Sequence, residues 1–403
     1  MVKLSWFGEE FLLLALRINR HFKGYIDFYY GPEKLSQIVQ TETLTSPNKL
    51  LKDSISLIKQ LGSQGYNKER ECYLKKLLIA MKTSIEILNG SNISIENQFL
   101  KIYDVTLQPA NEAELDNLKR EYEDAHGSNG NLEERIKKLR IKRRVPEEKV
   151  FEFFKKALDI VEKRTKELFR NLLPENEEIF LEITEETDKD SIKWTCYDWY
   201  LGNYKSRIEV NPRFHLYWTN LLTHSAHEGY PGHHTEFVVK ELKLYRELSQ
   251  FEHSILLLNS PKLIISEGIA DIAVNVLFSY RDQVEIGLNE FCPNILDEDS
   301  IETMIGQYSV KHKISLFWYN FAYHALIDNY TDAKLINYGK SHELFSEDLL
   351  VNQIRALKDP VYSKNVFTYN LGMNMIKNKY GEFPSANNFR NLLIKPILPS
   401  DLL

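Results

Sequence analysis

A short β-rich stretch interrupts an otherwise helical pattern, and this interruption sets the expected fold class. Up to residue 173, apolar residues recur at spacings of three and four, as in amphipathic helices. After Pro174, alternating runs rich in β-branched and aromatic residues cover Ile179–Thr184, Ser191–Trp199 and Ser206–Val210. From Trp218 the helical pattern returns and continues almost to the end. The sequence therefore predicts a mainly α fold with a small β-sheet.

The length of 403 residues exceeds what one simple core covers, so we expect two closely packed lobes. Residues 1–173 form the predicted helical N-terminal lobe. Residues 174–403 form the predicted second lobe, with the sheet first and helices after it. The helices expected in the first lobe are Leu4–Phe22, Pro47–Leu61, Asn67–Leu88, Ala110–Ala125 and Pro146–Leu173.

Composition excludes several classes of protein. The net charge of −6 argues against a dedicated nucleic-acid binder, which usually carries a basic excess. The apolar run Phe11–Leu16 is too short to span a membrane. The cysteines are odd in number and far apart, which fits a reducing compartment and gives no cysteine zinc site: Cys72, Cys196 and Cys292. We expect a cytoplasmic protein with no nucleic-acid or membrane partner.

Four of the eleven histidines lie in the segment HSAHEGYPGHH, which runs from His224 to His234. A neutral imidazole is the commonest metal ligand among side chains. A glutamate directly after a histidine is the arrangement of His-Glu-x-x-His metallopeptidases, where it acts as base toward the metal-bound water. The segment therefore predicts His227 as a metal ligand and Glu228 as the catalytic base.

The second histidine ligand is not where a regular helix would carry it. One turn after His227 stands Pro231, which cannot donate to the His227 carbonyl and clashes with it. The glycines on either side tolerate unusual backbone angles. A bulge or kink that loops out two residues would bring His233 to the second ligand position. We prefer His233 for this reason, with His234 as the alternative.

The third ligand is expected on a later helix. Glu267 lies between two apolar stretches, where an unpaired carboxylate is costly, although Ser266 and Glu267 could also cap a helix. Asp271, one turn later on the same face, is expected to accept the outer N–H of a ligating histidine. His224 either supports His227 or packs in the core. Three ligands with an open position predict one Zn²⁺ per chain, another divalent ion being the alternative.

The octapeptide HEGYPGHH, which runs from His227 to His234, resembles the signature of a zincin-like family, the domain of unknown function 885. Members of that family are grouped with the gluzincin metallopeptidases. Glu267-Gly268 resembles the family's downstream Glu-Gly pair, and Gly268 would let another backbone approach closely. The resemblance covers the C-terminal half of the chain. It implies a gluzincin-like, two-lobed helical architecture and a zinc peptidase.

Two further segments resemble the same family. Tyr204–Asn211 is similar to the strand ahead of the metal helix, which ends in asparagine and in gluzincins is an edge strand that pairs with extended substrate. This implies a substrate contact for Asn211. Near the C-terminus, an arginine, a proline and a Tyr-x-x-Gly motif are similar to the family pattern: Arg355, Pro360, Tyr369 and Gly372.

The remaining roles follow from the expected chemistry. A tetrahedral oxyanion needs a donor besides the metal, and Tyr369 is the first candidate, with Arg355 and His234 behind it. Arg355 could instead hold a substrate carboxylate through a bidentate pair, in a carboxypeptidase mode. His234 is otherwise expected to contact substrate.

The predicted function is a zinc-dependent peptidase or oligopeptidase that acts on a peptide substrate. The alternatives are hydrolysis of a small non-peptide amide, or binding of metal and peptide without cleavage. Glu228 favours an enzyme, because a binding protein needs no base beside the ligands.

Overall fold

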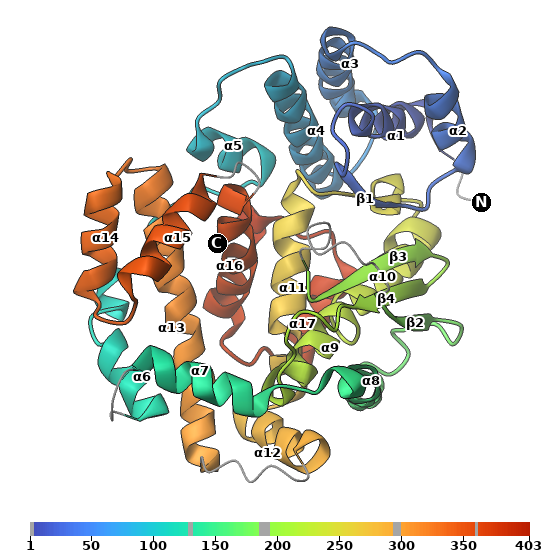
Figure 1. The fold of residues 1–403 in the computed structure, drawn as a ribbon. Coiled ribbons are helices and arrows are strands. Elements are labelled where there is room, and N and C mark those ends of the chain that lie inside the picture. Colours follow the sequence, from blue (N-terminus) through green and yellow to red (C-terminus); the bar gives the residue numbers. More distant parts are fainter. Residues whose placement is uncertain (1–3, 128–131, 185–193, 293–299, 359–361) are drawn as a thin grey trace.

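The computed structural model describes residues 4–127, 132–184, 194–292, 300–358 and 362–403. Within these ranges helices dominate and the strands form two small sheets, so the predicted fold class is confirmed (Figure 1). The helices of the first 173 residues are α1 (Trp6–Asn19), α2 (Glu33–Thr41), α3 (Pro47–Gln60), α4 (Lys68–Leu88), α5 (Ile95–Ile102), α6 (Leu118–His126), α7 (Leu132–Arg143) and α8 (Val150–Leu168).

Local capping explains where several of these helices begin. The Ser46 side chain accepts from the backbone N–H of Lys49 at the start of α3, and the Asn67 side chain accepts from Arg70 at the start of α4. Such oxygens satisfy N–H groups that have no partner inside the helix. Four of the five expected helices are present, as α1, α3, α4 and α8. The expected helix Ala110–Ala125 is instead a 3₁₀ turn at Glu112–Glu114 followed by the short helix α6, and α2 and α5 were not expected.

The larger sheet contains three strands at the predicted places, β2 (Glu178–Ile183), β3 (Cys196–Gly202) and β4 (Lys205–Val210). Residues 191–193, the start of the predicted second strand, lie outside the described residues. Their order is β2-β4-β3, with β4 parallel to β2 and antiparallel to β3. A second, two-stranded sheet pairs β1 (Ile26–Tyr29) with β5 (Ile255–Leu257), and the sequence pattern did not predict it. In the part of the chain that the structure describes, β3 is therefore an edge strand of the larger sheet.

Helix α11 lies at the centre of the second lobe, with the larger sheet on one side and α16 on the other (Figure 1). The helices after the sheet are α9 (Leu221–Glu228), α10 (His233–Lys240), α11 (Pro261–Leu277), α12 (Tyr280–Phe291), α13 (Ile301–Leu326), α14 (Asp332–Ser341), α15 (Glu347–Leu357), α16 (Tyr362–Tyr380) and α17 (Ala386–Ile394). Up to Asn275, α11 is buried except along one stripe at i+4 spacing, which is half-buried and consists of Leu263, Glu267, Asp271 and Asn275.

The crossing of α11 and α16 depends on two glycines. A Cβ on Gly268 would lie 2.5 Å from the backbone carbon of Gly372, and one on Gly372 would lie 1.9 Å from the Ile264 carbonyl oxygen. Any side chain at either position would force the helices apart. The expected close backbone approach at Gly268 is confirmed, and it fixes the part of α11 that carries Glu267.

The hydrophobic cores tie the two predicted lobes together. One core joins the N-terminal helices to the β1–β5 sheet, and another joins α8 to α9, α11 and α17. The boundary after residue 173 stays a prediction, and α8 shares its core with residues beyond it. No single described helix is long and apolar enough to span a membrane; only α11 and α12 together, bent by 77°, meet the length and composition criteria.

Candidate metal centre

The helical structure is interrupted between α9, which ends at Glu228, and α10, which begins at His233. The expected bulge in one helix is thus a gap between two helices. Gly232 explains why: its N–H donates to the Ala226 carbonyl at 2.9 Å, and a Cβ on it would lie 2.1 Å from the His227 carbonyl oxygen. Only glycine allows this approach, so the sequence folds the second helix back toward the first.

This fold brings the three predicted ligands together. The His227 and His233 rings face each other edge to face, with centroids 4.8 Å apart. Nε2 of His227 lies 3.8 Å from Glu267 Oε2, and Nε2 of His233 lies 3.8 Å from Glu267 Oε1. One potential ligand atom from each residue lies within 4.8 Å of the others. Glu267 projects from the middle of α11, so it does not cap a helix.

Neighbouring groups orient both imidazoles with Nε2 toward Glu267. Asp271 Oδ1 lies 3.1 Å from His227 Nδ1, as the sequence predicted, so Nδ1 carries the proton. Ser266 Oγ lies 3.3 Å from His233 Nδ1 and donates to Glu236 at 2.7 Å. Because that hydroxyl gives its proton to Glu236, it accepts from His233 Nδ1–H. Nε2 is therefore the ring atom left to bind a ligand in each neutral imidazole.

The donor set fits a zinc ion. Two nitrogens and a carboxylate oxygen are ligands that zinc accepts, and tetrahedral coordination places donors about 3.3 Å apart, close to the distances found. Glu267 Oε2 is buried and has no hydrogen-bond partner among the residues that the structure describes. A buried carboxylate oxygen without a partner is costly, and a cation between the three side chains would remove that cost.

The protonation of these groups has opposing physical causes. Burial raises the pKa of Glu267 to about 8, against the opposing effect of the His227 charge. Burial acts to lower the pKa of His227, but its hydrogen bond to Asp271 and the nearby carboxylates outweigh burial and raise it to about 10. Without a metal, both groups therefore carry a proton near neutral pH.

The three side chains open onto a cleft of about 580 Å³ that Glu228 also lines. The Glu228 side chain is buried, which raises its pKa, and the backbone N–H of Asp198 donates to its carboxyl.

The edge of β3 that is turned away from β4 follows from its hydrogen-bond pattern. On the β4 side, the Asn211 N–H donates to the Thr195 carbonyl at 2.8 Å. Backbone groups alternate along an antiparallel strand, so those of Cys196 and Asp198 point to the opposite edge of β3. This free edge faces the cleft.

The strand resemblance needs a correction. Tyr204–Asn211 covers β4, which is the central strand and has no free edge, because β2 and β3 cover both sides. Asn211 is buried at the end of β4, and its Oδ1 accepts from the Arg213 N–H at 3.1 Å. Its side chain closes a turn and does not line the cleft among the residues described there. The edge available to an extended peptide is that of β3.

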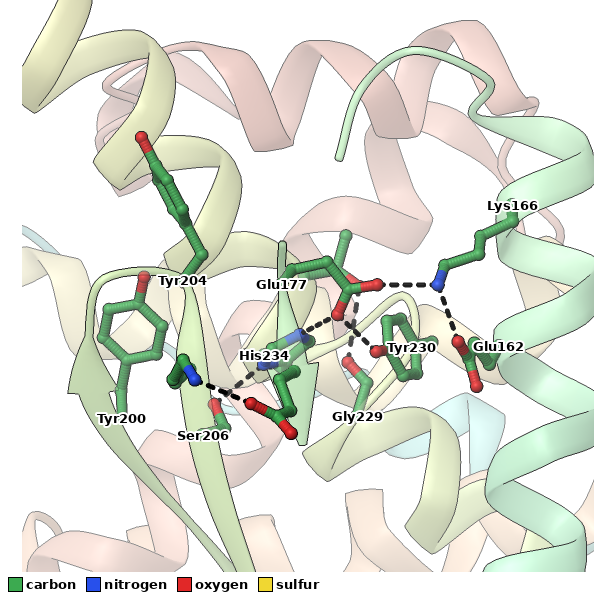
Figure 2. A network of polar contacts seen from close by, with 12 residues as sticks. Glu162, Lys166, Glu177, Tyr200, Tyr204, Ser206, Gly229, Tyr230 and His234 are labelled. Atoms are coloured by element: carbon green, nitrogen blue, oxygen red, sulfur yellow. Dashed lines mark hydrogen bonds and ion pairs between the residues drawn. The ribbon is translucent and has the colours of Figure 1, made fainter. Parts of the chain in front are cut away.

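His234 belongs to a polar network (Figure 2) and is not among the described residues that line the cleft. Its ring is fully buried, with Nε2 2.9 Å from Glu177 and Nδ1 2.8 Å from the Ser206 hydroxyl. Glu177 also accepts from the Tyr230 hydroxyl at 2.5 Å and pairs with Lys166 at 2.7 Å. Both ring nitrogens of His234 are thus engaged. The predictions that it contacts substrate, serves the oxyanion or replaces His233 as ligand are wrong.

The network ties the break between α9 and α10 to its surroundings. Because the carboxylate of Glu177 can only accept, His234 Nε2 carries the proton and Nδ1 accepts from Ser206. Glu177 precedes β2, Ser206 lies in β4 and Lys166 in α8. Three elements thereby hold the segment that sets the position of His233. Sequence reasoning missed Glu177, since it belongs to no motif and lies far from the histidines in the chain.

The other predicted residues have different positions. His224 lines the cleft, and its Nε2 lies 3.0 Å from the Asn220 amide nitrogen; burial lowers its pKa to about 3. Arg355 is exposed on α15 and is not among the described residues that line the cleft, so the structure does not place it at the site. Tyr369 lies in α16, and its side chain is outside the described part, as is Pro360.

Besides Asp198 of β3, two charged residues line the cleft that the sequence pattern did not single out. Asp27 comes from β1 and accepts from the Tyr197 hydroxyl, and burial raises its pKa to about 6. Lys311 comes from α13. Neither lies in a motif. Contacts of β1 with β3, and of α13 with α16, which packs on α11, bring them to the candidate metal centre.

Comparison with known proteins gives structural relatives only. No protein-family model matches the chain, and no curated protein matches it. The fold resembles the crystal structure of the putative lipoprotein from Colwellia psychrerythraea, with a TM-score of 0.52, 16% identity, and coverage of 92% of this chain and 68% of that one. A putative lipoprotein of unknown function from Shewanella oneidensis gives a TM-score of 0.47 and 12% identity, with 96% and 80% covered. At such identities the first likeness shows a shared fold and nothing about activity.

Proposed function

We propose that this chain is a zinc-dependent peptidase of the zincin-like, gluzincin type, related to the family of domain of unknown function 885. The observation that carries the proposal is the convergence of two oriented imidazole Nε2 atoms on Glu267, with the carboxyl of Glu228 in the same cleft. His227, His233 and Glu267 would hold the ion. When bound, zinc supplies Lewis-acid polarisation of a carbonyl and acidifies a water molecule.

Glu228 is the proposed general base. Its carboxyl lies at the end of α9, directly after a proposed ligand, and the Asp198 N–H fixes its position. Burial raises its pKa, which makes the carboxylate a better proton acceptor than an exposed glutamate. It would take a proton from the attacking water and later deliver it to the leaving amine. A protein that only binds metal has no need of this group.

The free edge of β3 is the proposed peptide-binding strand. The Cys196 backbone groups and the Asp198 carbonyl point toward the cleft and can form main-chain hydrogen bonds with an extended peptide, whereas the Asp198 N–H is engaged by Glu228. Such pairing would lay the scissile bond beside Glu228, because the Asp198 N–H already contacts that carboxyl. Tyr369 stays the proposed oxyanion donor, on the α16 helix whose Gly372 contacts the backbone next to Glu267.

The test is to incubate zinc-loaded protein with a mixed peptide library and identify the products by mass spectrometry. We expect cleavage, and the product ends show whether the enzyme acts inside a chain or at one terminus. Glu228→Gln is the matched control, because it keeps the shape and the zinc ligands; we expect unchanged zinc content and a rate about 10²- to 10⁴-fold lower. Absence of cleavage by zinc-loaded wild-type protein would contradict the proposal.

We also propose a reducing compartment, the cytoplasm. The described residues form no disulfide, and Cys196 and Cys292 are buried in the core. Free buried thiols are common where glutathione keeps cysteines reduced.

A further inference from the structure

The cleft has an uneven distribution of charge. Besides the proposed ligands, its described lining carries the acidic side chains of Asp27, Asp198, Glu228 and Asp271. Lys311 is the single lysine or arginine in that described lining. The proposed metal chemistry does not use the positive charge of Lys311, although the other charged side chains in this described lining are acidic.

Lys311 lacks a direct counter-ion in the part of the chain that the structure describes. It makes no ion pair or side-chain hydrogen bond to a described residue, and Asp271 is the carboxylate that acts on it at longer range. Its side chain keeps contact with solvent, although enclosure by the surrounding protein lowers its pKa. An exposed ammonium group at the edge of the cleft that has no ion pair to a described residue is available to bind an anion from outside.

Lys311 also lies where the cleft meets a second cavity. That cavity measures about 430 Å³ and is lined by Lys311, Arg140 and Arg143, with no acidic side chain among its described lining residues. Arg140 comes from α7, which crosses α13 in Figure 1, and its charge acts on Lys311. The described lining is therefore acidic around the candidate metal centre and basic in this cavity beyond Lys311. A third cavity that Lys311 lines, of about 280 Å³, has mixed charge, with Asp271, Lys377 and Glu382. A ligand that fits the cleft and the basic cavity carries a negative group on one side of the bond to be cut.

We propose that Lys311, with Arg140 behind it, forms a carboxylate-binding subsite beside the metal centre, so that the preferred substrates are peptides with a carboxylate next to the scissile bond. The inference rests on the proposed peptidase function and assigns its substrate class. It also gives Lys311 the carboxylate-binding role that the sequence suggested for Arg355. The carboxylate is either the C-terminus of the peptide or an acidic side chain, since both present the same group to an ammonium.

The test measures binding in the zinc-loaded Glu228→Gln background, where peptides stay intact. The probes are acetyl-Ala-Ala-Phe with a free C-terminus, the same peptide as its amide, and acetyl-Ala-Glu-Ala amide. We expect a carboxylate-bearing probe to bind about tenfold or more tightly than the neutral amide, as a charge-assisted hydrogen bond provides. Lys311→Met should abolish this preference, and Lys311→Arg should retain it.

Lys313→Met is the matched control. It removes the same charge from the same helix, but Lys313 pairs with Glu121 and does not line the cleft in the described part of the chain. A preference for the free acid assigns the subsite to the C-terminus, and a preference for the glutamate probe assigns it to a side chain. Equal binding of all three probes, no binding of any, or a preference that survives Lys311→Met overturns the proposal. Cleavage by the wild-type enzyme with a Lys311-independent preference would leave the peptidase function standing and remove only the subsite.

Discussion

Proton release on zinc binding is the first prediction, because the same contacts that orient the ligands also hold protons on them. The raised pKa values, about 10 for His227 and about 8 for Glu267, mean that both groups are protonated at neutral pH without metal. Both must lose that proton to bind zinc. Zinc affinity should therefore rise with pH and not stay level.

The size of the effect follows from these two pKa values. At pH 7 the His227 imidazole is almost fully protonated and the Glu267 carboxyl roughly nine-tenths so, which gives about two protons released per zinc. Removing them at pH 7 costs about 5 kcal/mol, at 1.36 kcal/mol per pH unit. Between pH 6 and pH 7 the zinc affinity should rise about 100-fold, close to tenfold for each proton.

The assay is isothermal titration of the metal-free protein with zinc, in buffers that bind zinc weakly and differ in ionisation enthalpy. Competition with a chelator supplies the affinity at each pH. Asp271→Asn is the matched variant: it removes the hydrogen bond that raises the pKa of His227, so fewer protons should be released. An affinity that stays level between pH 6 and pH 7, or release of less than half a proton, would refute the assigned contacts.

Two further predictions concern the scaffold that holds the centre. Gly372→Ala should lower the free energy of unfolding by about 1–3 kcal/mol, since its Cβ would overlap the Ile264 carbonyl. Gly306→Ala is the control and should not destabilise the protein, because its Cβ would lie 3.8 Å from Ala125. Equal denaturation midpoints for the two variants would contradict this. Burial acts to raise the pKa of Glu177, but hydrogen bonds from its partners lower it to about 2. The stabilising effect of the ionised Glu177 is therefore present above about pH 4.5 and is lost as the pH falls toward 2. In denaturant unfolding, Glu177→Gln should be about 1–3 kcal/mol less stable than wild type at pH 7 and equally stable near pH 2. Wild-type stability of that variant at pH 7 would count against the network.

The positions of the proposed ligands could be predicted from sequence because their chemistry is local. His227, Glu228 and His233 lie in one segment. Pro231 and the glycines on either side of it predict an irregular backbone, and this irregularity places His233 beside His227. Glu267 lies far along the chain, but a carboxylate between apolar stretches has few other uses. The mainly α class followed from periodicity in the same way, since long helices carry their signal within themselves.

The rest depended on packing between distant elements, which one sequence does not reveal. The edge strand was assigned to β4, but strand order depends on which strands pair, and β2 covers that edge. His234 was expected in the cleft, yet Glu177, 57 residues earlier, holds it in the polar network outside the described cleft lining. Lys311 belongs to no motif, and its proposed role depends on acidic residues and arginines that lie near it in space but far from it in the sequence.

The zinc content of the purified protein tests the central claim most directly. After removal of bound metal, reloading with zinc and desalting, the wild-type chain should retain about one zinc ion, and His233→Ala should retain almost none while its helical circular dichroism stays unchanged. His233 is the decisive position, since its place beside His227 and Glu267 depends on the break after α9. A wild-type chain that retains no zinc, or a folded His233→Ala variant that retains a full equivalent, would contradict the proposed centre.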